Sequence, residues 1–264
     1  MTTDLRRIQN IEIDMLKEFH KVCMDNNLTY YVLGGTLLGA VRHGGFIPWD
    51  DDIDIGMPRK DYEVFLNSAS SELPTNLKLY SNPLNLNISQ IVDVRTKIKL
   101  GTQITGVFID VFPLDGYPKG KIEARLHSFK ILFYRMLCKL SVIDKLDNHD
   151  RGILENSIVK ITRLTKFNKL LNEESLVKKL HRIIQRYDFS SSEKVGNVLG
   201  RYREKEIVDK SFFGEPKLVK FEDIQVMAPE RIEDYLENIY GDFMQLPPKE
   251  QQLAHDITII KLSE

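Results

Sequence analysis

The sequence predicts an α+β fold: an α/β layer in which helices flank a small mixed sheet, plus a helical insertion. Three observations support this prediction. Segments with helical and strand-like apolar spacing alternate up to about residue 120, residues 121–187 have a helical and basic pattern, and mixed structure returns after Gly196. The chain has 264 residues, 42% of them hydrophobic and 28% charged, which is a globular composition sufficient for a core with an appended part.

The first 120 residues alternate helix and strand signals. Apolar residues near the N-terminus recur on one helical face, and Asn26 and Asn27 suit its end. "TYYVL" then predicts a short buried strand, and the segment "GGTLLGAVRHGG" predicts a short helix between two glycine pairs. "DDIDIG" alternates charge and isoleucine like a half-buried strand, and Pro58 suits the first turn of a helix. The predicted helices are 4–26, 34–45 and 58–70, and the predicted strands are 29–33, 51–56, 88–98 and 106–116.

The middle of the chain differs in charge from the rest. Residues 121–187 hold fifteen Lys/Arg and seven Asp/Glu, a net charge of +8 in a chain of net −1. Within 122–143, apolar residues alternate with Lys130, Arg135 and Lys139 in the pattern of a basic amphipathic helix, which is typical of anionic-lipid binding. A solvated basic face is the alternative.

The last part returns to mixed structure. The segment "FEDIQVMAPE" (221–230) predicts a strand that enters a helix, with Pro229 at its first turn and Gly241 at its end. The tail "LPPKEQQLAHD" looks irregular. We therefore divide the chain into 1–120, 121–190 and 191–264, and expect the third part to pack back on the first.

Composition excludes several classes of protein. Cys23 and Cys138 have no paired spacing, which argues against a disulfide scaffold or a cysteine zinc site and fits a reducing cytoplasm. The N-terminus has no apolar core of a signal peptide, and no stretch reaches the roughly 18 consecutive apolar residues of a membrane span. The basic residues form no recognisable nucleic-acid module. We expect a cytoplasmic protein that binds no nucleic acid.

The segment "GGFIPWDDDIDIGMPR" places Asp50, Asp51, Asp52 and Asp54 among apolar residues. On a strand, Asp52 and Asp54 share a face, and a divalent cation usually relieves the repulsion between such carboxylates. An EF-hand is rejected because Ile55 occupies its glycine position and Pro58 interrupts the loop. The D-x-D of a metal-dependent glycosyltransferase and an aspartyl-phosphate nucleophile are further alternatives.

The elements on either side of the acidic segment favour one kind of site. Gly34, Gly35 and Thr36 follow a strand and open a helix, where backbone N–H groups bind phosphate. Asp110 lies between Phe108 and Phe112 on one strand face, so this acid should have a cation or act as a base. A phosphate-binding turn with three carboxylates predicts a two-metal phosphoryl-transfer site.

These motifs resemble the LicD family, which shares the nucleotidyltransferase fold and is related to fukutin-type proteins. "GGTLLGAVRHGGFIPWDDDIDIGM" looks like the family signature, and "FIDVFPLDGYP" and "YLENIYGDFMQLPPKEQQLAHD" look like its later motifs. The resemblance covers most of the chain and implies that 1–120 is a nucleotidyltransferase-like catalytic core with a mixed sheet. It also implies metal-dependent transfer of a phospho-alcohol, typically phosphocholine, from a CDP-linked donor to a teichoic acid or lipopolysaccharide precursor.

The resemblance assigns roles to individual residues. Asp52, Asp54 and Asp110 would hold Mg²⁺ or Mn²⁺, and Asp110 would hold a second metal, accept the acceptor's hydroxyl proton, or both. Gly34, Gly35 and Thr36 would hold the nucleotide phosphate. The sequence "QIVDVRTKI" departs from the family pattern around Arg95, a candidate phosphate contact. Arg42 and His43 either reach the donor or cap their helix. Asp50 and Asp51 are expected to bond the backbone or Arg42 and not the metal.

Trp49 either contacts a quaternary ammonium through a cation–π interaction or packs in the core. His255 and Asp256 lie in the tail motif and are read as structural. The expected partners are CDP-choline or another CDP-alcohol, a lipid-linked glycan and the anionic inner leaflet. The alternatives are a nucleotidyltransferase that adds NMP to a small acceptor and a silent nucleotide-binding or membrane-scaffold module.

Overall fold

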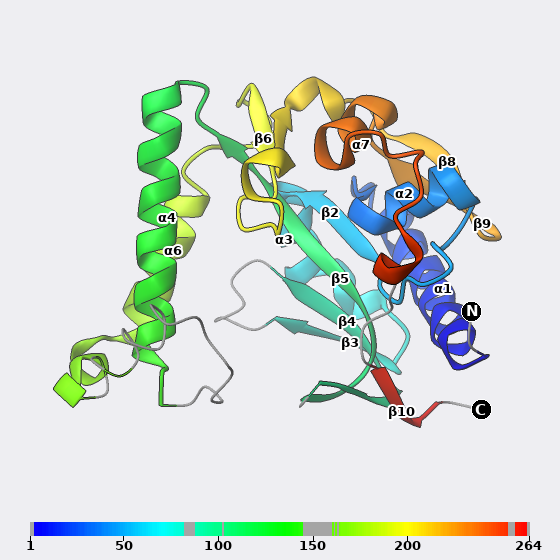
Figure 1. The fold of residues 1–264 in the computed structure, drawn as a ribbon, viewed down its shortest axis with the longest axis horizontal. Helices are drawn as coiled ribbons and strands as arrows, with labels where there is room; N and C mark the ends of the chain where they lie inside the picture. The colour runs from blue at the N-terminus through cyan, green and yellow to red at the C-terminus, as the bar shows by residue number, and fades with distance from the viewer. Residues whose placement is uncertain are drawn as a thin grey trace.

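Figure 1 shows a computed structural model of the protein, which describes residues 3–81, 88–101, 103–144, 160, 162, 164–252 and 257–262. Within these residues the fold is α+β: a curled mixed sheet is flanked by helices, as the sequence predicts. The helices are α1 (Thr3–Asp25), α2 (Gly34–His43), α3 (Arg59–Asn67), α4 (Lys121–Ser141), α6 (Glu173–Ile184) and α7 (Ile232–Tyr240). Short 3₁₀ turns are η1 (Ala69–Glu72), η2 (Phe167–Leu170), η3 (Arg203–Glu206), η4 (Lys210–Phe212) and η5 (Lys249–Gln251).

The main sheet contains eight of the described strands, in the order β1-β2-β5-β4-β10, with β3 paired to β4 and β6 between β5 and β7. Its strands are β1 (Tyr31–Val32), β2 (Asp54–Pro58), β3 (Leu77–Ser81), β4 (Ser89–Leu100), β5 (Gln103–Tyr117), β6 (Lys194–Gly196), β7 (Ile207–Asp209) and β10 (Ile257–Lys261). Strands β2 and β5 run parallel, and their register places Asp54 opposite Asp110. Tertiary pairing thus joins two acids that are far apart in the sequence.

Two predicted elements need correction, and one strand was not predicted. The acidic strand begins at Asp54 rather than residue 51, so Asp52 lies in the loop that enters the strand. The strand predicted within 221–230 is β9 (Ile224–Ala228), which forms a hairpin with the preceding β8 (Lys217–Phe221) through a turn where Glu222 has a φ of 54°. Helix α7 begins at Ile232, so Pro229 lies before the helix and not in its first turn. Beyond the irregular tail, β10 pairs antiparallel with β4, which adds a strand that no sequence pattern indicated.

Helix α1 builds one side of the core. Phe19 is fully buried, and its ring makes edge-on contacts with Tyr30 and Phe65 at centroid distances of 5.1 Å. Edge-to-face pairs of this kind add to the free energy gained by burying the rings. Near the start of α1, Gln9 donates to the Asp50 carbonyl at 2.8 Å and so ties the helix to the acidic loop that precedes β2.

Helices α4 and α6 form a separate pair at one edge of the molecule (Figure 1). They share a small core made of Ile131, Cys138, Leu180 and Ile184. The main sheet reaches toward this pair through β5, whose Asp115 accepts two hydrogen bonds from Arg59 of α3 at 2.6 and 2.8 Å. In the part of the chain that the structure describes, no helix has the length and apolarity needed to cross a bilayer.

Candidate active site

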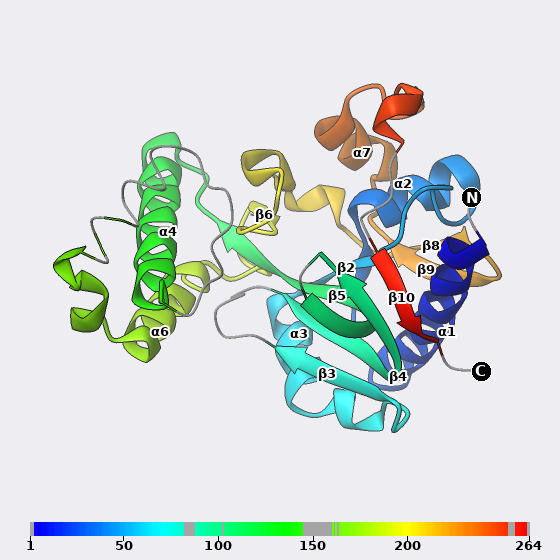
Figure 2. The ribbon, with the colours of Figure 1, turned by 60° about the horizontal axis from the view of Figure 1, so that its bottom comes forward.

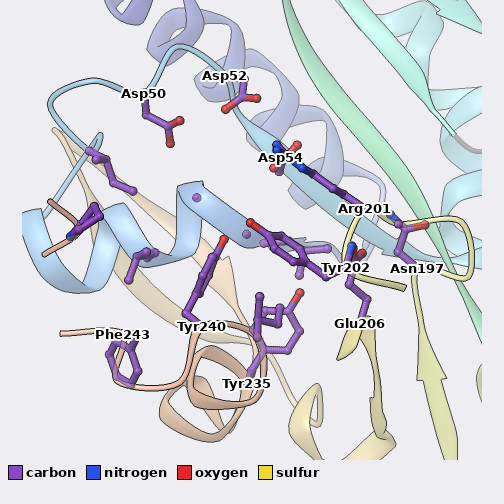
Figure 3. Close-up of a pocket in the computed structure, with 18 of the residues that line it drawn as sticks. Asp50, Asp52, Asp54, Asn197, Arg201, Tyr202, Glu206, Tyr235, Tyr240 and Phe243 are labelled. Carbon is purple, nitrogen blue, oxygen red and sulfur yellow. The ribbon is translucent and has the colours of Figure 1, made fainter. Parts of the chain in front are cut away.

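A cavity of about 1050 Å³ opens beside the acidic loop. The acidic loop and the start of α2 form one side of it, and α7 with the segment around η3 forms the other. Figure 3 shows Asp50, Asp52 and Asp54 on the first side and Tyr202, Tyr235 and Tyr240 across from them. The cavity therefore joins a strongly acidic wall to an aromatic wall.

The acidic wall is held by backbone hydrogen bonds. The Asp54 carbonyl accepts from Leu33 N–H at 2.9 Å, and the Asp54 N–H donates to Thr36 Oγ1 at 2.9 Å. Ile53 O accepts from the Asp110 N–H at 2.9 Å, and Asp50 O accepts from the side chain of Gln9 on α1 at 2.8 Å. Because neighbouring elements satisfy the backbone, the loop presents its carboxylates in one place.

Carboxylate oxygens of Asp50, Asp51 and Asp52 lie within 4.8 Å of one another, a spacing that suits a metal ion. Asp51 is the buried member of the three. The sequence predicted Asp52, Asp54 and Asp110 as ligands and set Asp50 and Asp51 aside, whereas the structure adds these two to the candidate donors. The assignment of Asp52, Asp54 and Asp110 as the metal ligands stays a prediction.

Asp54 and Asp110 occupy neighbouring positions on parallel strands. Burial raises the pKa of Asp54 well above its usual range, and the charges of Asp52 and Asp110 add to this shift. Burial raises the pKa of Asp110 to about 6. A hydrogen bond from Gln90 Nε2 to Asp110 Oδ1 at 2.8 Å acts in the opposite direction and lowers this pKa. Asp110 is thus not alone among aromatics, as the strand pattern suggested, because Gln90 from β4 contacts it.

The glycine pair lies directly against these acids. Gly34 has a φ of 51°, and a Cβ there would lie 3.0 Å from Asp54 Oδ2. A Cβ on Gly35 would lie 2.6 Å from Asp50 Oδ2. The two glycines let the positive end of α2 approach the carboxylates closely, and both line the cavity. Thr36 is buried and holds Asp54 in place; its role as a phosphate contact, like that of the glycines, stays a prediction.

Glu12 on α1 is a sixth acid, which the sequence analysis missed. Its side chain is buried, and Oε2 has no hydrogen-bond partner among the described residues. Burial raises its pKa well above the usual range, and the charges of Asp52 and Asp51 raise it further. Its only signal in the sequence is an acid among the apolar residues of a helical face, which periodicity alone does not connect to residues 50–52.

The aromatic wall was also missed, because its residues come from distant segments. The Tyr202 and Tyr240 rings meet edge to face at a centroid distance of 5.7 Å, and Tyr235 is buried beside them. Glu206 lines the same wall; its Oε1 accepts from the Tyr202 N–H at 2.7 Å, and burial raises the pKa of Glu206. An acid among tyrosines forms an environment that favours an organic cation.

The fold places Arg42 and Arg95, the two arginines predicted as donor contacts, in different parts of the molecule. Arg42 lines the cavity and donates to the Phe243 carbonyl at 3.0 Å, whereas the end of α2 is capped by the Gly44 N–H; a donor contact by Arg42 stays a prediction. Arg95 is not among the described residues that line the cavity; it pairs with Asp93 at 2.6 Å on β4. Arg135 of α4 and Arg201 line the cavity instead. Arg135, which the sequence analysis grouped with Lys130 and Lys139, therefore lines the cavity.

Four other predicted residues remain. Trp49 lines the cavity and contacts the exposed His43 edge to face, with centroids 6.3 Å apart. His255 and Asp256 lie outside the described residues.

Comparisons with known proteins identify the family of the chain. The family model "LicD/FKTN/FKRP, nucleotidyltransferase domain" matches residues 27–135, which include the glycine turn, the acidic loop and Asp110. The lipopolysaccharide cholinephosphotransferase LicD of Haemophilus influenzae is 30% identical over 96% of each chain. The human ribitol 5-phosphate transferase FKRP is 56% identical over 32 residues, 12% of this chain and 6% of its own. The similarity to the Haemophilus protein spans nearly the whole of both chains, and the protein therefore belongs to the LicD family.

Proposed function

We propose that the protein transfers a phospho-alcohol, with phosphocholine favoured, from a CDP-linked donor to a hydroxyl of a cell-surface glycan precursor, and releases CMP. The observation that carries this proposal is the cavity in which an acidic wall faces an aromatic wall containing Glu206. One wall suits a diphosphate with its cation, and the other suits a quaternary ammonium. The printed activities of the relatives, cholinephosphotransferase and ribitol 5-phosphate transferase, support the phospho-alcohol class.

The residues present fit a divalent cation. Asp50, Asp52 and Asp54 all line the cavity, and Glu12 Oε2 is buried without a partner close behind them. So many like charges in a partly buried place are costly unless a cation joins them. We propose that Asp52 and Asp54, with Asp110 or Asp50, hold Mg²⁺ or Mn²⁺, which when bound neutralises charge on the diphosphate.

The chain's own residues would then direct the reaction. The N-terminus of α2 would lie against the donor phosphates, and Arg135 and Arg201 would offset further negative charge from the opposite side. The acceptor oxygen attacks the phosphorus that bears the alcohol, and the bond from this phosphorus to the CMP oxygen breaks. Where Asp50 rather than Asp110 completes the metal site, Asp110 would accept the hydroxyl proton, a role that suits a carboxyl whose pKa is raised to about 6.

The acceptor we propose is a lipid-linked precursor of teichoic acid or lipopolysaccharide. Such an acceptor would be met at the inner face of the cell membrane by a cytoplasmic, peripheral enzyme.

The test is a panel of donors. Purified protein with Mg²⁺ is incubated with CDP-choline, CDP-ethanolamine, CDP-glycerol, CDP-ribitol and ATP, and both thermal protection and nucleotide products are measured. CMP release with preference for CDP-choline supports the proposal. An acceptor–NMP adduct with diphosphate would instead establish the nucleotidyltransferase alternative, and binding without turnover of any donor would indicate a silent module.

A further inference from the structure

Helix α4 has two apolar faces, and among the residues that the structure describes only one of them is packed. Ile131 and Cys138 on one face belong to the small core shared with α6. The other face carries large apolar side chains that are exposed: Ile122 (77%), Leu126 (56%), Phe129 (66%), Phe133 (41%) and Met136 (40%). We call these five residues the α4 stripe.

The spacing of the α4 stripe makes it continuous. Its members follow one another by four, three, four and three residues, so they lie along a single side of the helix. The Phe129 and Phe133 rings stack at a centroid distance of 6.2 Å. Figures 1 and 2 both show α4 at the edge of the molecule, away from the main sheet. Contiguous exposed apolar surface of this kind usually marks an interaction site.

Basic side chains border the α4 stripe. At 100° per residue, Arg125 and Lys139 fall on one border and Lys130 on the other, and all three are exposed. An apolar stripe between two basic borders is the pattern of a helix that lies in the interface of an anionic bilayer. The same borders disfavour a second copy of this chain, because like charges would meet across the contact.

We propose that the α4 stripe docks on an anionic lipid bilayer, with α4 lying in the plane of the headgroups. This deepens the proposed function, since it names the surface on which a lipid-linked acceptor would be met. The lipid contact is nevertheless testable without turnover. The cavity residue Arg135 is excluded from the basic borders, so binding to lipid and binding to donor use different side chains.

The first experiment measures tryptophan fluorescence. The parent chain contains a single tryptophan, Trp49, whose emission is the background signal. A Phe129→Trp variant is mixed with vesicles in which one third of the lipid is phosphatidylglycerol and the rest is phosphatidylcholine. Its fluorescence should shift to the blue and be quenched by brominated lipid, while the parent protein changes little. Tyr80→Trp, at a 54% exposed position on β3, is the matched control and should not respond. A Phe129→Trp signal that stays unchanged at low salt would overturn the proposal.

The second experiment separates the apolar and basic contributions by vesicle flotation. The triple change Leu126→Ser, Phe129→Ser and Phe133→Ser should abolish flotation, whereas Tyr80→Ser, Ile104→Ser and Leu218→Ser, which are equally exposed elsewhere, should not. Replacing Arg125, Lys130 and Lys139 with Gln should weaken binding by about a hundredfold, since each basic residue near an anionic surface contributes about a factor of five. Lys78, Lys97 and Lys99, exposed on β3 and β4, give the charge-matched control.

The outcomes separate the two proposals. Loss of flotation in both α4 variants, with unchanged turnover of a soluble acceptor analogue by the same variants, supports lipid docking. Flotation equal to the parent in the Ser variant overturns it. If the parent is instead a dimer in solution and the Ser variant a monomer, the α4 stripe binds a second copy and the proposal is wrong. Lipid binding by a protein that turns over no CDP-alcohol would contradict the proposed function alone.

Discussion

At the scale of single residues, the site is dominated by like charge. Glu12, Asp50, Asp52, Asp54 and Asp110 influence one another, and burial raises the pKa values of Glu12, Asp54 and Asp110. Repulsion of this kind destabilises a fold in the absence of a cation. These acids nevertheless lie together in the folded protein, which is the physical reason to expect a bound metal.

The first prediction concerns the metal carboxylates. Replacing Asp52, Asp54 or Asp110 singly with Asn should lower kcat at least about a hundredfold, because each removes a ligand or the base. The melting temperature without metal should stay equal or rise, since repulsion is relieved. Asp25→Asn, an exposed change on α1, is the control and should leave both unchanged. Full activity in Asp52→Asn, or equal activity in EDTA, contradicts the metal assignment.

The second prediction concerns donor selectivity. Glu206→Gln should raise the KM for CDP-choline about tenfold, because the variant loses the charge that attracts a quaternary ammonium. The KM for CDP-glycerol, which has no cation, should barely change. Glu204→Gln, exposed on the same 3₁₀ turn, is the matched control. Equal effects on both donors would mean that Glu206 shapes the wall without reading the alcohol.

The third prediction is a pH dependence. The pKa of Glu12 is raised in the folded protein, so the unfolded chain loses this proton first as pH rises. The free energy of unfolding should therefore fall with rising pH above the ordinary pKa of 4.5. Glu12→Gln should flatten this decline between pH 5 and pH 8, as measured by urea unfolding in EDTA. Glu18→Gln on the same helix should keep the parent slope, and an unchanged slope in Glu12→Gln contradicts the prediction.

At the scale of elements, one buried ion pair joins α3 to the end of β5. Arg59 and Asp115 form two hydrogen bonds, and their side chains are 14% and 1% exposed. Strand β5 leads from here directly into α4. The pair therefore helps to fix where the helical part leaves the sheet.

The fourth prediction tests this pair. Asp115→Asn should lower the free energy of unfolding by about 3–5 kcal/mol, because it leaves the buried Arg59 charge uncompensated. Combining Arg59→Met with Asp115→Leu should recover part of the loss. Asp234→Asn, which breaks the exposed pair with Arg231, should cost less than about 1 kcal/mol. Chemical denaturation gives all three values, and a loss in Asp115→Asn as small as in Asp234→Asn would show that the pair is dispensable.

At the scale of the whole molecule, the acidic loop joins α1, α2 and the sheet. A cation bound there should stabilise the complete fold by mass action, by about 2.7 kcal/mol at a hundred times its Kd. The fifth prediction is that Mg²⁺ raises the melting temperature of the parent protein and EDTA reverses this. Asp52→Asn should respond little, and an equal Mg²⁺ response in this variant would place the metal elsewhere.

Local patterns in the sequence were enough to predict the fold class, the helical and basic middle part and the importance of the acidic segment. These features are local: apolar spacing shows α1, α4 and β5, and an unusual run of Asp among apolar residues shows the site. The resemblance of the glycine turn and acidic loop to the LicD family was likewise readable from a continuous segment. Local patterns of this kind need no knowledge of which segments meet.

Which distant residues share the candidate site depends on packing between elements. Parallel pairing of β2 and β5 places Asp110 next to Asp54, and packing of α1 brings Glu12 behind the acidic loop. The aromatic wall with Glu206, the turn of Arg135 toward the cavity and the exposure of the α4 stripe follow in the same way. The physical reason is that side-chain periodicity shows which residues share a face of one element, while packing between elements decides what that face contacts.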